Sequence, residues 1–264
     1  MADLMPDSNA MPLIALQDVG KRFASGLQAL AGVSLNVNAA EFVSLVGPSG
    51  CGKSTVLRLV AALDEPSAGT VRSPRRGKDG AIAFVFQEPT LMPWTSVFDN
   101  VWLPLRLQGH KRKEAAPLVR ATLAGVGLAE FENAYPAQLS GGMKMRVSIA
   151  RALIVRPKVL LMDEPFAALD DITRQKLNAD LLRCWHGQSM AAIFVTHTVG
   201  EAVFLSQRVV VMSARPGRVL REITIDEPYP RTSAFRHSAA YNDACRRIEA
   251  TLDQGAEQAI ATST

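Results

Sequence analysis

Residues Gly47 to Thr55 are GPSGCGKST, and they follow the apolar run EFVSLV at 41–46. The stretch fits the phosphate-loop pattern GxxxxGK[ST] in the context that the pattern needs, with an apolar strand before it and the helical run KSTVLRLVAAL after it. The glycines let successive backbone N–H groups point inward, and the following helix adds its positive N-terminal end. This stretch therefore predicts a polyphosphate site. An ordinary glycine turn is the alternative, and the lysine and hydroxyls in the expected order make it the weaker one.

Three side chains at the end of this loop have predicted roles in nucleotide chemistry. Lys53 bridges the β- and γ-phosphates, Ser54 supplies a hydroxyl to Mg²⁺, and Thr55 is placed to reach the α-phosphate. The sequence therefore predicts a nucleotide bound together with a magnesium ion.

Length and composition favour a folded α/β protein that lies outside the membrane. The 264 residues are 48% apolar, enough for one large domain or two small ones. Cys51, Cys184 and Cys245 are odd in number and widely spaced, as in reduced, unligated cytosolic cysteines. No apolar run approaches the ~18 residues of a membrane span, and the first residues lack the pattern of a signal peptide. The net charge of +4 is scattered, which gives little support for nucleic-acid binding, and the basic cluster at 72–78 is interpreted as a solvated loop.

The apolar runs along the chain predict a mostly parallel sheet with helices between its strands. Three β-like runs near the N-terminus predict an antiparallel patch that leads into the loop strand, at 13–19, 27–37 and 41–47. Four later runs are continuous and apolar, as in buried strands, at 81–86, 158–164, 191–197 and 208–213. From about Glu88 to Val155 the periodicity is helical without a strand signal, which predicts a helical insertion. Functional loops of such sheets lie at the carboxyl ends of the strands.

A second motif is VLLMDEPFAALDD at 159–171, where a buried strand ends in paired acids. Asp163 at the strand end can hold a Mg²⁺-bound water, and Glu164 faces the γ-phosphate side as a general base or water-orienting carboxylate. Solvated acids at a turn are the alternative, which the neighbouring phosphate loop disfavours.

A third motif is QLSGGMKMRVSIARAL at 138–153. Ser140 is a good N-cap, Gly141 and Gly142 leave backbone amides open, and Met143, Val147, Ala150 and Ile154 form a helical seam. The pattern predicts a second helix N-terminus suited to an anion. An SGG alone is usually only a helix start, and this one lies far from the phosphate loop in sequence. The two sites therefore need not hold one nucleotide within one chain.

Together these motifs resemble the ATP-binding subunit of ABC transporters over about residues 12–222. The matches are Walker A at 47–55, the Q-loop Gln87, the signature LSGGM at 139–143, Walker B at 159–164, the D-loop at 168–170 and the switch histidine His197. The resemblance implies an α/β P-loop NTPase core of RecA type, with an antiparallel β subdomain and a helical subdomain at about 88–155. Residues 223–264 would follow as a C-terminal extension.

The resemblance also implies the residues that bind and hydrolyse ATP. Phe23 would stack on adenine, although it could instead cover the small β-patch. Gln87 would touch Mg²⁺ or the attacking water, and His197 would hydrogen-bond the γ-phosphate, beside the catalytic Lys53 and Glu164. The magnesium ligands would be Ser54, Gln87 and Asp163. The other implied nucleotide contacts are Gly47, Pro48, Ser49, Gly50, Cys51, Gly52, Lys53, Ser54, Thr55, Ser140, Gly141 and Gly142.

The partners implied by the resemblance are a second copy of the subunit and a permease. Two subunits meet head to tail, with each ATP between the Walker A of one and the signature of the other. Leu91 to Trp94, Val101 and Trp102 would line the groove that receives a membrane-subunit helix, or else form core. The chain would act at the cytoplasmic face of the inner membrane, indirectly served by a periplasmic or lipoprotein solute-binding protein, and without nucleic acid.

Two stretches look most like the importers of nitrate, sulfonates and taurine, namely FQEPTLMPWTSVFDNV at 86–101 and MSARPGRV at 212–219. The resemblance therefore implies a cytoplasmic ATPase that powers import of a small anion through a separate permease. One alternative is an ABC ATPase of nucleic-acid repair or translation. Another is a P-loop kinase, for which LSGGM and His197 would lack a purpose.

The C-terminal half contains a predicted helix start at Thr198 and a predicted connector before a C-terminal helix. Thr198 stands where the family often has aspartate, and with Glu201 three residues later it predicts a capping box. Residues 224–232 are interpreted as a connector because of their prolines. The extension that follows carries Tyr241, Cys245, Ile248 and Leu252 on one face of a helix, and its last dozen residues are expected to fray.

Overall fold

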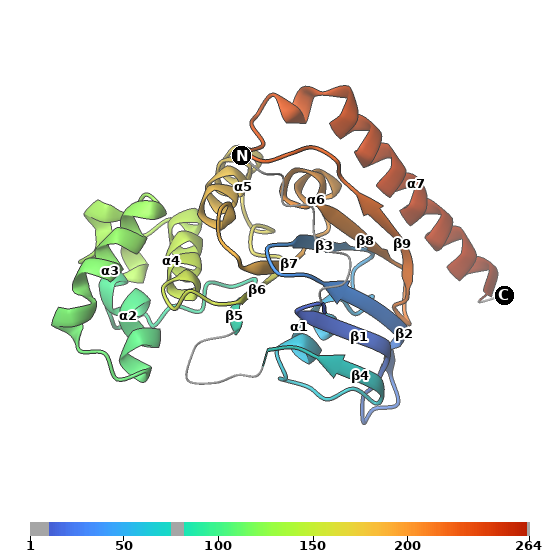
Figure 1. The fold of residues 1–264 in the computed structure, drawn as a ribbon, viewed down its shortest axis with the longest axis horizontal. Coiled ribbons are helices and arrows are strands. Elements are labelled where there is room, and N and C mark those ends of the chain that lie inside the picture. The colour runs from blue at the N-terminus through green and yellow to red at the C-terminus, as the bar shows by residue number, and fades with distance from the viewer. Residues whose placement is uncertain (1–10, 75–81, 263–264) are drawn as a thin grey trace.

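A six-stranded sheet lies at the centre of the computed structural model, which describes residues 11–74 and 82–262 (Figure 1). Its strand order is β5-β6-β7-β3-β8-β9; the first five strands pair in parallel and β9 is antiparallel to β8. The strands are β3 (Phe42–Val46), β5 (Ile82–Val85), β6 (Val159–Asp163), β7 (Ala191–Val195), β8 (Arg208–Met212) and β9 (Val219–Thr224). The predicted α/β fold is therefore confirmed, and β9 is an unpredicted edge strand. The predicted domain boundary after residue 222 falls inside β9, because pairing with β8 continues to Thr224.

A second, smaller sheet has the order β2-β1-β4 and is antiparallel. It consists of β1 (Ile14–Arg22), β2 (Gln28–Val37) and β4 (Ala68–Arg72). The predicted antiparallel patch is thus present, and β4 joins it from beyond α1 (Lys53–Val60). Arg72, the first residue of the basic cluster expected in a solvated loop, belongs to β4 and donates to the Pro12 carbonyl at 2.8 Å. Residues 75–78 of that cluster lie outside the described residues.

Each face of the central sheet has its own apolar core, since successive side chains of a strand point to opposite faces. In β3, Phe42 packs edge-on against Trp185 with ring centroids 5.3 Å apart, within a core shared with α5 (Asp171–Trp185) and α6 (Val199–Leu205). Val43 and Leu45 pack on the other side, against α1 and the antiparallel sheet. This explains why the parallel strands are continuously apolar.

The predicted helical insertion forms a separate group of helices at the left of Figure 1. It contains α2 (Val97–Leu107), α3 (Arg112–Gly125), α4 (Gly141–Leu153) and the short turns η1 (Ala129–Phe131) and η2 (Pro136–Gln138). Its own core includes Val101, Val119, Leu123 and Val147, all fully buried. Of the predicted helical seam, Val147, Ala150 and Ile154 are buried there and Met143 packs beside them.

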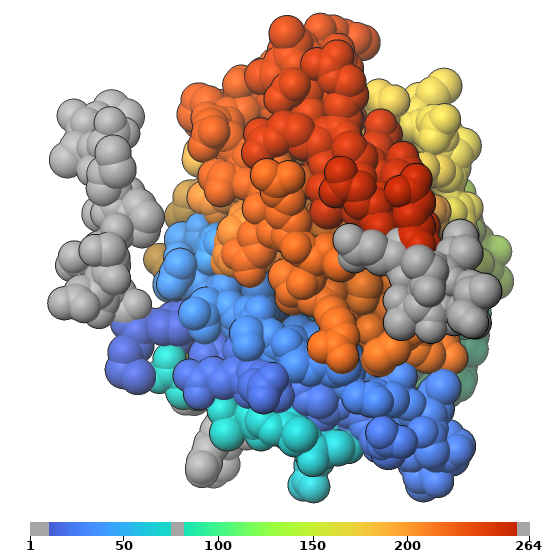
Figure 2. All heavy atoms as spheres, turned by 90° about the vertical axis from the view of Figure 1, so that its right-hand side faces the viewer, coloured from blue at the N-terminus to red at the C-terminus, as the bar shows by residue number. Residues whose placement is uncertain are grey.

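The C-terminal extension contains η3 (Phe235–His237) and the long helix α7 (Ala239–Thr262). Figure 2 shows α7 in red, lying over the orange segments that precede it. The helix reaches Thr262, although the last dozen residues were expected to fray. The reason is packing: Ile248 is fully buried, Thr251 is nearly so, and Gly255 lies directly against Leu220 of β9.

The connector before α7 is not simply solvated. Its Arg231 is buried and donates to the carbonyl oxygens of Val203 and Ser206, both at 2.8 Å. This guanidinium therefore holds the connector against the end of α6.

Candidate nucleotide-binding site

The predicted site residues, apart from Phe23 and the signature residues Ser140, Gly141 and Gly142, lie at the carboxyl edge of the five parallel strands. In the order β5, β6, β7, β3, β8 these strands are followed by Gln87, the pair Asp163 and Glu164, His197, the phosphate loop and Arg215. Carboxyl ends of parallel strands meet at one edge, where such sheets bind their ligands. Residues far apart in the sequence are thereby brought side by side.

The phosphate loop connects β3 to α1 and has the backbone that its glycines predict. Gly50 and Gly52 have φ of 73° and 103°, a left-handed region that favours glycine. Lys53 is only 4% exposed, and its Nζ donates to the carbonyl oxygens of Gly47 at 2.7 Å and Pro48 at 3.0 Å. The ammonium is therefore held inside the curve of its own loop.

The phosphate loop and the Walker B strand are joined by a side-chain hydrogen bond. Ser54 Oγ donates to Asp163 Oδ1 at 2.9 Å. Burial raises the pKa of Asp163 above its ordinary value, and the neighbouring Glu164 carboxylate raises it further, against the lowering effect of the Ser54 hydrogen bond.

The chemistry of this pair fits magnesium, which prefers oxygen ligands. Within residues 11–74 and 82–262, three or more His, Cys, Asp or Glu side chains nowhere gather into a group that could hold a metal ion. A magnesium ion at Ser54 and Asp163 would thus depend on oxygens from phosphate and water for its remaining ligands.

Glu164 and His197 face each other at the ends of β6 and β7. His197 Nδ1 lies 3.3 Å from Glu164 Oε2, with the two side chains 53% and 24% exposed respectively. Glu164 has φ of 45°, and its backbone N–H donates to the Val195 carbonyl at 3.0 Å. A non-glycine residue in this region costs about 1 kcal/mol or more, a strain that is often found at functional sites.

The capping box expected from Thr198 and Glu201 is absent, and this prediction is wrong. Thr198 makes no side-chain cap. The buried Glu201 instead accepts a hydrogen bond from Thr196 Oγ1 at 2.5 Å, and Thr196 Oγ1 in turn accepts from the Thr198 backbone N–H at 3.0 Å. Glu201 bonds to Thr196 because its side chain is buried in the core beside Asn178, where a carboxylate needs a hydrogen-bond partner.

A cleft of about 200 Å³ lies in front of the phosphate loop. Phe23, expected to stack on adenine, is 36% exposed on one side of it, with Lys21 Nζ 5.4 Å from its ring centroid. Gln87 is exposed at the end of β5 and is not among the lining residues. The lining comprises Phe23, Leu27, Ala29, Gly50, Gly52, Lys53, Ser54, Thr55, Glu164 and Arg215.

Arg215 is a lining residue that sequence reasoning missed. It follows β8, immediately beside β3, and its guanidinium donates to the Gly50 carbonyl from Nε at 3.1 Å and Nη2 at 2.9 Å. The rule that functional loops follow the carboxyl ends of strands applies equally to the run at 208–213 and could have found it.

The signature segment lies elsewhere. Ser140 is the predicted N-cap of α4, and its Oγ accepts from the Met143 N–H at 3.3 Å. Ser140, Gly142 and Met143 line a separate hollow of about 400 Å³ together with the start of α5. The structure therefore does not bring Ser140, Gly141 or Gly142 to the phosphate loop of the same chain.

The apolar segment after Gln87 is partly core and partly surface. Val101 is fully buried, and Leu91 and Trp102 pack against the helical core. Trp94, however, is 75% exposed. Asn100 shapes this loop, since its side chain accepts from the Met92 N–H at 2.8 Å and donates to the Met92 carbonyl at 3.1 Å.

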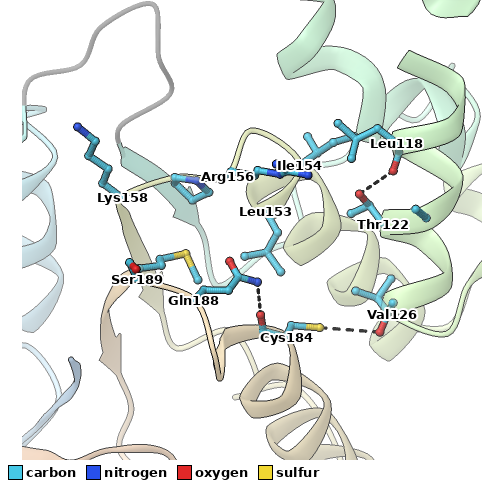
Figure 3. Close-up of a pocket in the computed structure, with 14 residues that line it drawn as sticks. Leu118, Thr122, Val126, Leu153, Ile154, Arg156, Lys158, Cys184, Gln188 and Ser189 are labelled. Atoms are coloured by element: carbon cyan, nitrogen blue, oxygen red, sulfur yellow. Dashed lines mark hydrogen bonds between the residues drawn. The ribbon is translucent and has the colours of Figure 1, made fainter. Parts of the chain in front are cut away.

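A larger cavity of about 580 Å³ lies between α3, the end of α4 and the end of α5 (Figure 3). Its labelled side chains include Leu118, Val126, Leu153 and Ile154, and Cys184 donates to the Gly125 carbonyl beside it. None of the predicted site residues lines it.

The sequence profile described as "ABC transporter" matches residues 30–167. The chain belongs to the ABC transporter family. As an ABC-type ATPase it hydrolyses ATP. No helix in the described part of this ATPase combines the length and apolar character that crossing a membrane requires.

Relatives of this ABC ATPase align over most of its length. It is 48% identical over 208 residues to an uncharacterized ABC transporter ATP-binding protein of Methanocaldococcus jannaschii, with 78% of each chain covered. It is 45% identical over 225 residues to a nitrate import ATP-binding protein of Synechocystis, covering 83% and 84% of the two chains. For a taurine import ATP-binding protein of Chromobacterium violaceum the identity is 44% over 225 residues, covering 84% and 85%.

A solved structure has the same fold. It is a dimeric ATP-binding cassette, MJ0796, in a post-hydrolysis state bound to ADP and phosphate. The TM-score is 0.72 at 32% identity, with 81% of this chain and 100% of the other covered.

Proposed function

We propose that this chain is the ATP-hydrolysing subunit of an importer that energises uptake of a small anion, such as nitrate, a sulfonate or taurine, through a separate permease. The convergence of Lys53, the Ser54 and Asp163 pair, and the Glu164 and His197 pair on one edge of the sheet carries the proposal. The names of the nitrate and taurine relatives support the class of solute.

Nucleotide binding in this proposal uses residues 47–55, whose backbone N–H groups and helix start surround the phosphates. Lys53 would exchange the carbonyls of Gly47 and Pro48 for phosphate oxygens, a change from neutral to charged acceptors that strengthens its hydrogen bonds. Phe23 would cover the adenine ring, since its exposed face borders the same cleft.

Magnesium would be held by Ser54, by Asp163, which is hydrogen-bonded to Ser54, and by Gln87, which follows β5 next to β6. When bound, the ion neutralises charge that develops on the phosphates. The exposed position of Gln87 leaves it free to approach the site when nucleotide is present.

Hydrolysis would depend on Glu164 and His197. The Glu164 carboxylate orients a water and takes its proton as the water oxygen bonds to the γ-phosphorus. The bond from that phosphorus to the bridging oxygen breaks, and ADP leaves with the bonding electrons. His197, directly beside Glu164, would donate a hydrogen bond to the γ-phosphate oxygens.

The proposal also includes a second copy of this chain, and the two copies are arranged head to tail. Ser140, Gly141 and Gly142 lie away from the phosphate loop of their own chain and would complete the site of the other. The related ATP-binding cassette that is dimeric with ADP and phosphate supports this arrangement.

The permease would dock on the loop that presents Trp94, directly after Gln87. Docking there would link the site to transport at the cytoplasmic face of the inner membrane, served indirectly by a solute-binding protein. The proposed division is an ATPase domain that starts at residue 12 and ends with β9 at Thr224 rather than at the predicted 222, with its helical part at 88–155 and the extension after it. The proposal includes no nucleic-acid partner, because the net charge of +4 is scattered along the sequence.

Growth of a deletion strain tests the importer. Cells lacking this chain are grown with nitrate as the only nitrogen source, or with taurine or an alkanesulfonate as the only sulfur source. The intact chain is expected to restore growth and solute uptake on at least one of them, and Glu164→Gln is not. Equal growth of deleted and restored strains on all three would contradict the proposed class of solute.

A further inference from the structure

A tight turn between β8 and β9, SARPGR at 213–218, lies against the nucleotide cleft. Ser213 and Arg218 join the two ends of the turn by hydrogen bonds. The Ser213 N–H donates to the Arg218 carbonyl at 2.9 Å, and Ser213 Oγ accepts from the Arg218 N–H at 3.0 Å while donating to the Pro216 carbonyl at 3.2 Å. The turn is therefore a well-defined platform for Arg215.

The same turn is fastened to the phosphate loop and to β2. The Gly217 N–H donates to the Ala29 carbonyl at 2.8 Å, and the Ala31 N–H donates to the Gly217 carbonyl at 3.0 Å. Gly217 also approaches Cys51 so closely that a Cβ would overlap the Cys51 carbonyl oxygen. These contacts fix the backbone of the turn, and therefore the position of the Arg215 Cα, relative to the phosphate loop.

The guanidinium of Arg215 lies on the backbone of the phosphate loop. A Cβ on Gly50 would come within 2.8 Å of its Nη2, so glycine at this position makes room for the cation. No carboxylate of the described residues lies within ion-pair distance of Arg215, whereas Arg208 at the start of β8 pairs with Glu41 and Glu222. An exposed, unneutralised guanidinium thus borders the cleft.

We propose that Arg215 is a further nucleotide-binding residue, which contacts the phosphates of ATP from the β8 side of the loop. A guanidinium has five N–H donors in a planar fork suited to phosphate. Its contact with the single Gly50 carbonyl engages only the Nε and Nη2 side of that fork. All five parallel strands would then contribute to the site at their carboxyl ends. This inference rests on the proposed nucleotide site.

A purely structural role for Arg215 makes a different prediction. If the side chain only fastens the turn to the Gly50 carbonyl, an uncharged N–H donor serves equally well. If it binds phosphate, the charge is essential. Arg215→Gln keeps a donor and removes the charge, whereas Arg215→Lys keeps the charge. Arg218→Ala is the matched control, because Arg218 is exposed on the same turn and does not line the cleft.

The experiment measures the Kd of Mg-ATP and ADP for these variants, for Arg215→Ala and for Lys53→Ala, at low and high salt. We expect Arg215→Ala and Arg215→Gln to weaken ATP binding roughly tenfold, because each removes a charge-assisted contact. Arg215→Lys should retain part of the affinity, and Arg218→Ala should bind as the wild type does. The loss should shrink at high salt.

Two outcomes would overturn the inference: wild-type affinity in Arg215→Gln, or equal losses in Arg215→Ala and Arg218→Ala. Thermal unfolding without nucleotide checks that the variants are folded. Lys53→Ala distinguishes a failure of the proposed role of Arg215 from a failure of the proposed nucleotide site. If it abolishes binding while the Arg215 variants bind normally, only the role of Arg215 fails, and if it also binds normally, the proposed nucleotide site fails.

Discussion

The phosphate loop and the signature segment are both glycine-rich helix starts, yet they differ in what surrounds them. The loop before α1 lies at the edge of the central sheet, where Lys53 is buried and Ser54 bonds to Asp163 of another strand. The start of α4 lies in the helical insertion, with Gly141 exposed and no charged group of the cleft beside it. The cleft at the first site contains both cations and the carboxylate Glu164, whereas the hollow beside the second contains the cations Arg146 and Lys176 and no carboxylate.

Their glycines also serve different purposes. A Cβ on Gly52 would lie 2.6 Å from Leu30 Cδ2, and Gly52 has a left-handed backbone, so the fold itself requires glycine there. A Cβ on Gly141 would lie 3.7 Å from Leu169 Cδ2, an ordinary contact. The fold can therefore accept a side chain at Gly141, and a functional loss there would point to a molecule outside the chain.

The largest expected effect comes from removing the cation of the phosphate loop. Lys53→Ala should lower ATP turnover by about 10²- to 10³-fold, because a preorganised charge at the transferring phosphoryl group is lost. Phosphate release by the purified protein measures this. Lys113→Ala, which removes an exposed lysine of α3, is the control. Near-normal turnover in a folded Lys53→Ala protein would contradict the role of the phosphate loop as the helix start that supplies the catalytic cation.

Mixing two damaged chains tests whether the signature segment serves another subunit. One chain carries Lys53→Ala and the other Gly141→Asp, and each homodimer has a lesion in both sites. In a head-to-tail heterodimer both lesions fall in one site, so the other site is intact. We expect ATP-dependent association to reappear in the mixture, measured on a sizing column with Mg-ATP. If each site lay within one chain, no mixture could restore association, and this result would contradict the shared site.

The outer surface of the helical insertion is tested at Trp94. Trp94→Ala should weaken the hold on the membrane subunits roughly tenfold or more, as expected for a buried aromatic anchor of an interface. The ATPase of the isolated chain should stay unchanged, because Trp94 is 75% exposed and does not line the cleft. Pull-down with the permease measures the effect, and Leu107→Ala, 80% exposed at the other end of α2, is the control. A strongly lowered unfolding temperature for Trp94→Ala would show that the side chain stabilises the fold and would contradict its role in docking.

The smallest expected effect concerns the core behind His197, where burial raises the pKa of Glu201 above its ordinary value. A raised carboxyl pKa in the folded state gives a stability contribution that is complete below the ordinary pKa and is lost as pH rises through the raised one. Glu201 therefore makes folding less favourable at pH 7 than at acid pH. Glu201→Gln should stabilise the protein by about 1 kcal/mol at pH 7, with the gain shrinking toward acid pH.

The packing around Glu201 supports that sign. Glutamine could still accept from Thr196. The Asn178 amide, whose Nδ2 donates to Glu201 Oε1 at 3.5 Å, would turn over, and its buried, unpartnered Oδ1 would then accept from the glutamine Nε2. Thermal unfolding at several pH values measures the gain, with the exposed Glu249→Gln as control. A lower unfolding temperature for Glu201→Gln at pH 7 would show that the charged form is the stabilising one.

The sequence was most informative where the backbone itself needs particular residues. Glycines at Gly50 and Gly52 and the N-cap at Ser140 have local causes, and the structure has the conformations that they predict. Short elements whose existence depends on a distant partner were missed, as with β4 and β9. The capping box at Thr198 failed for a partly related reason, since Glu201 is engaged by Asn178 of α5 and by Thr196 in the loop before α6.

By itself, the sequence determined the phosphate loop, the alternation of buried strands and helices, and the acids that end β6. Only the tertiary structure decided that β3 lies between β7 and β8, which places the loop next to His197 on one side and Arg215 on the other. Strand order depends on contacts between segments far apart in the chain, whose closure entropy and packing no local pattern contains. The motifs thus predict a nucleotide-binding site, and the order of the strands decides which side chains surround the nucleotide.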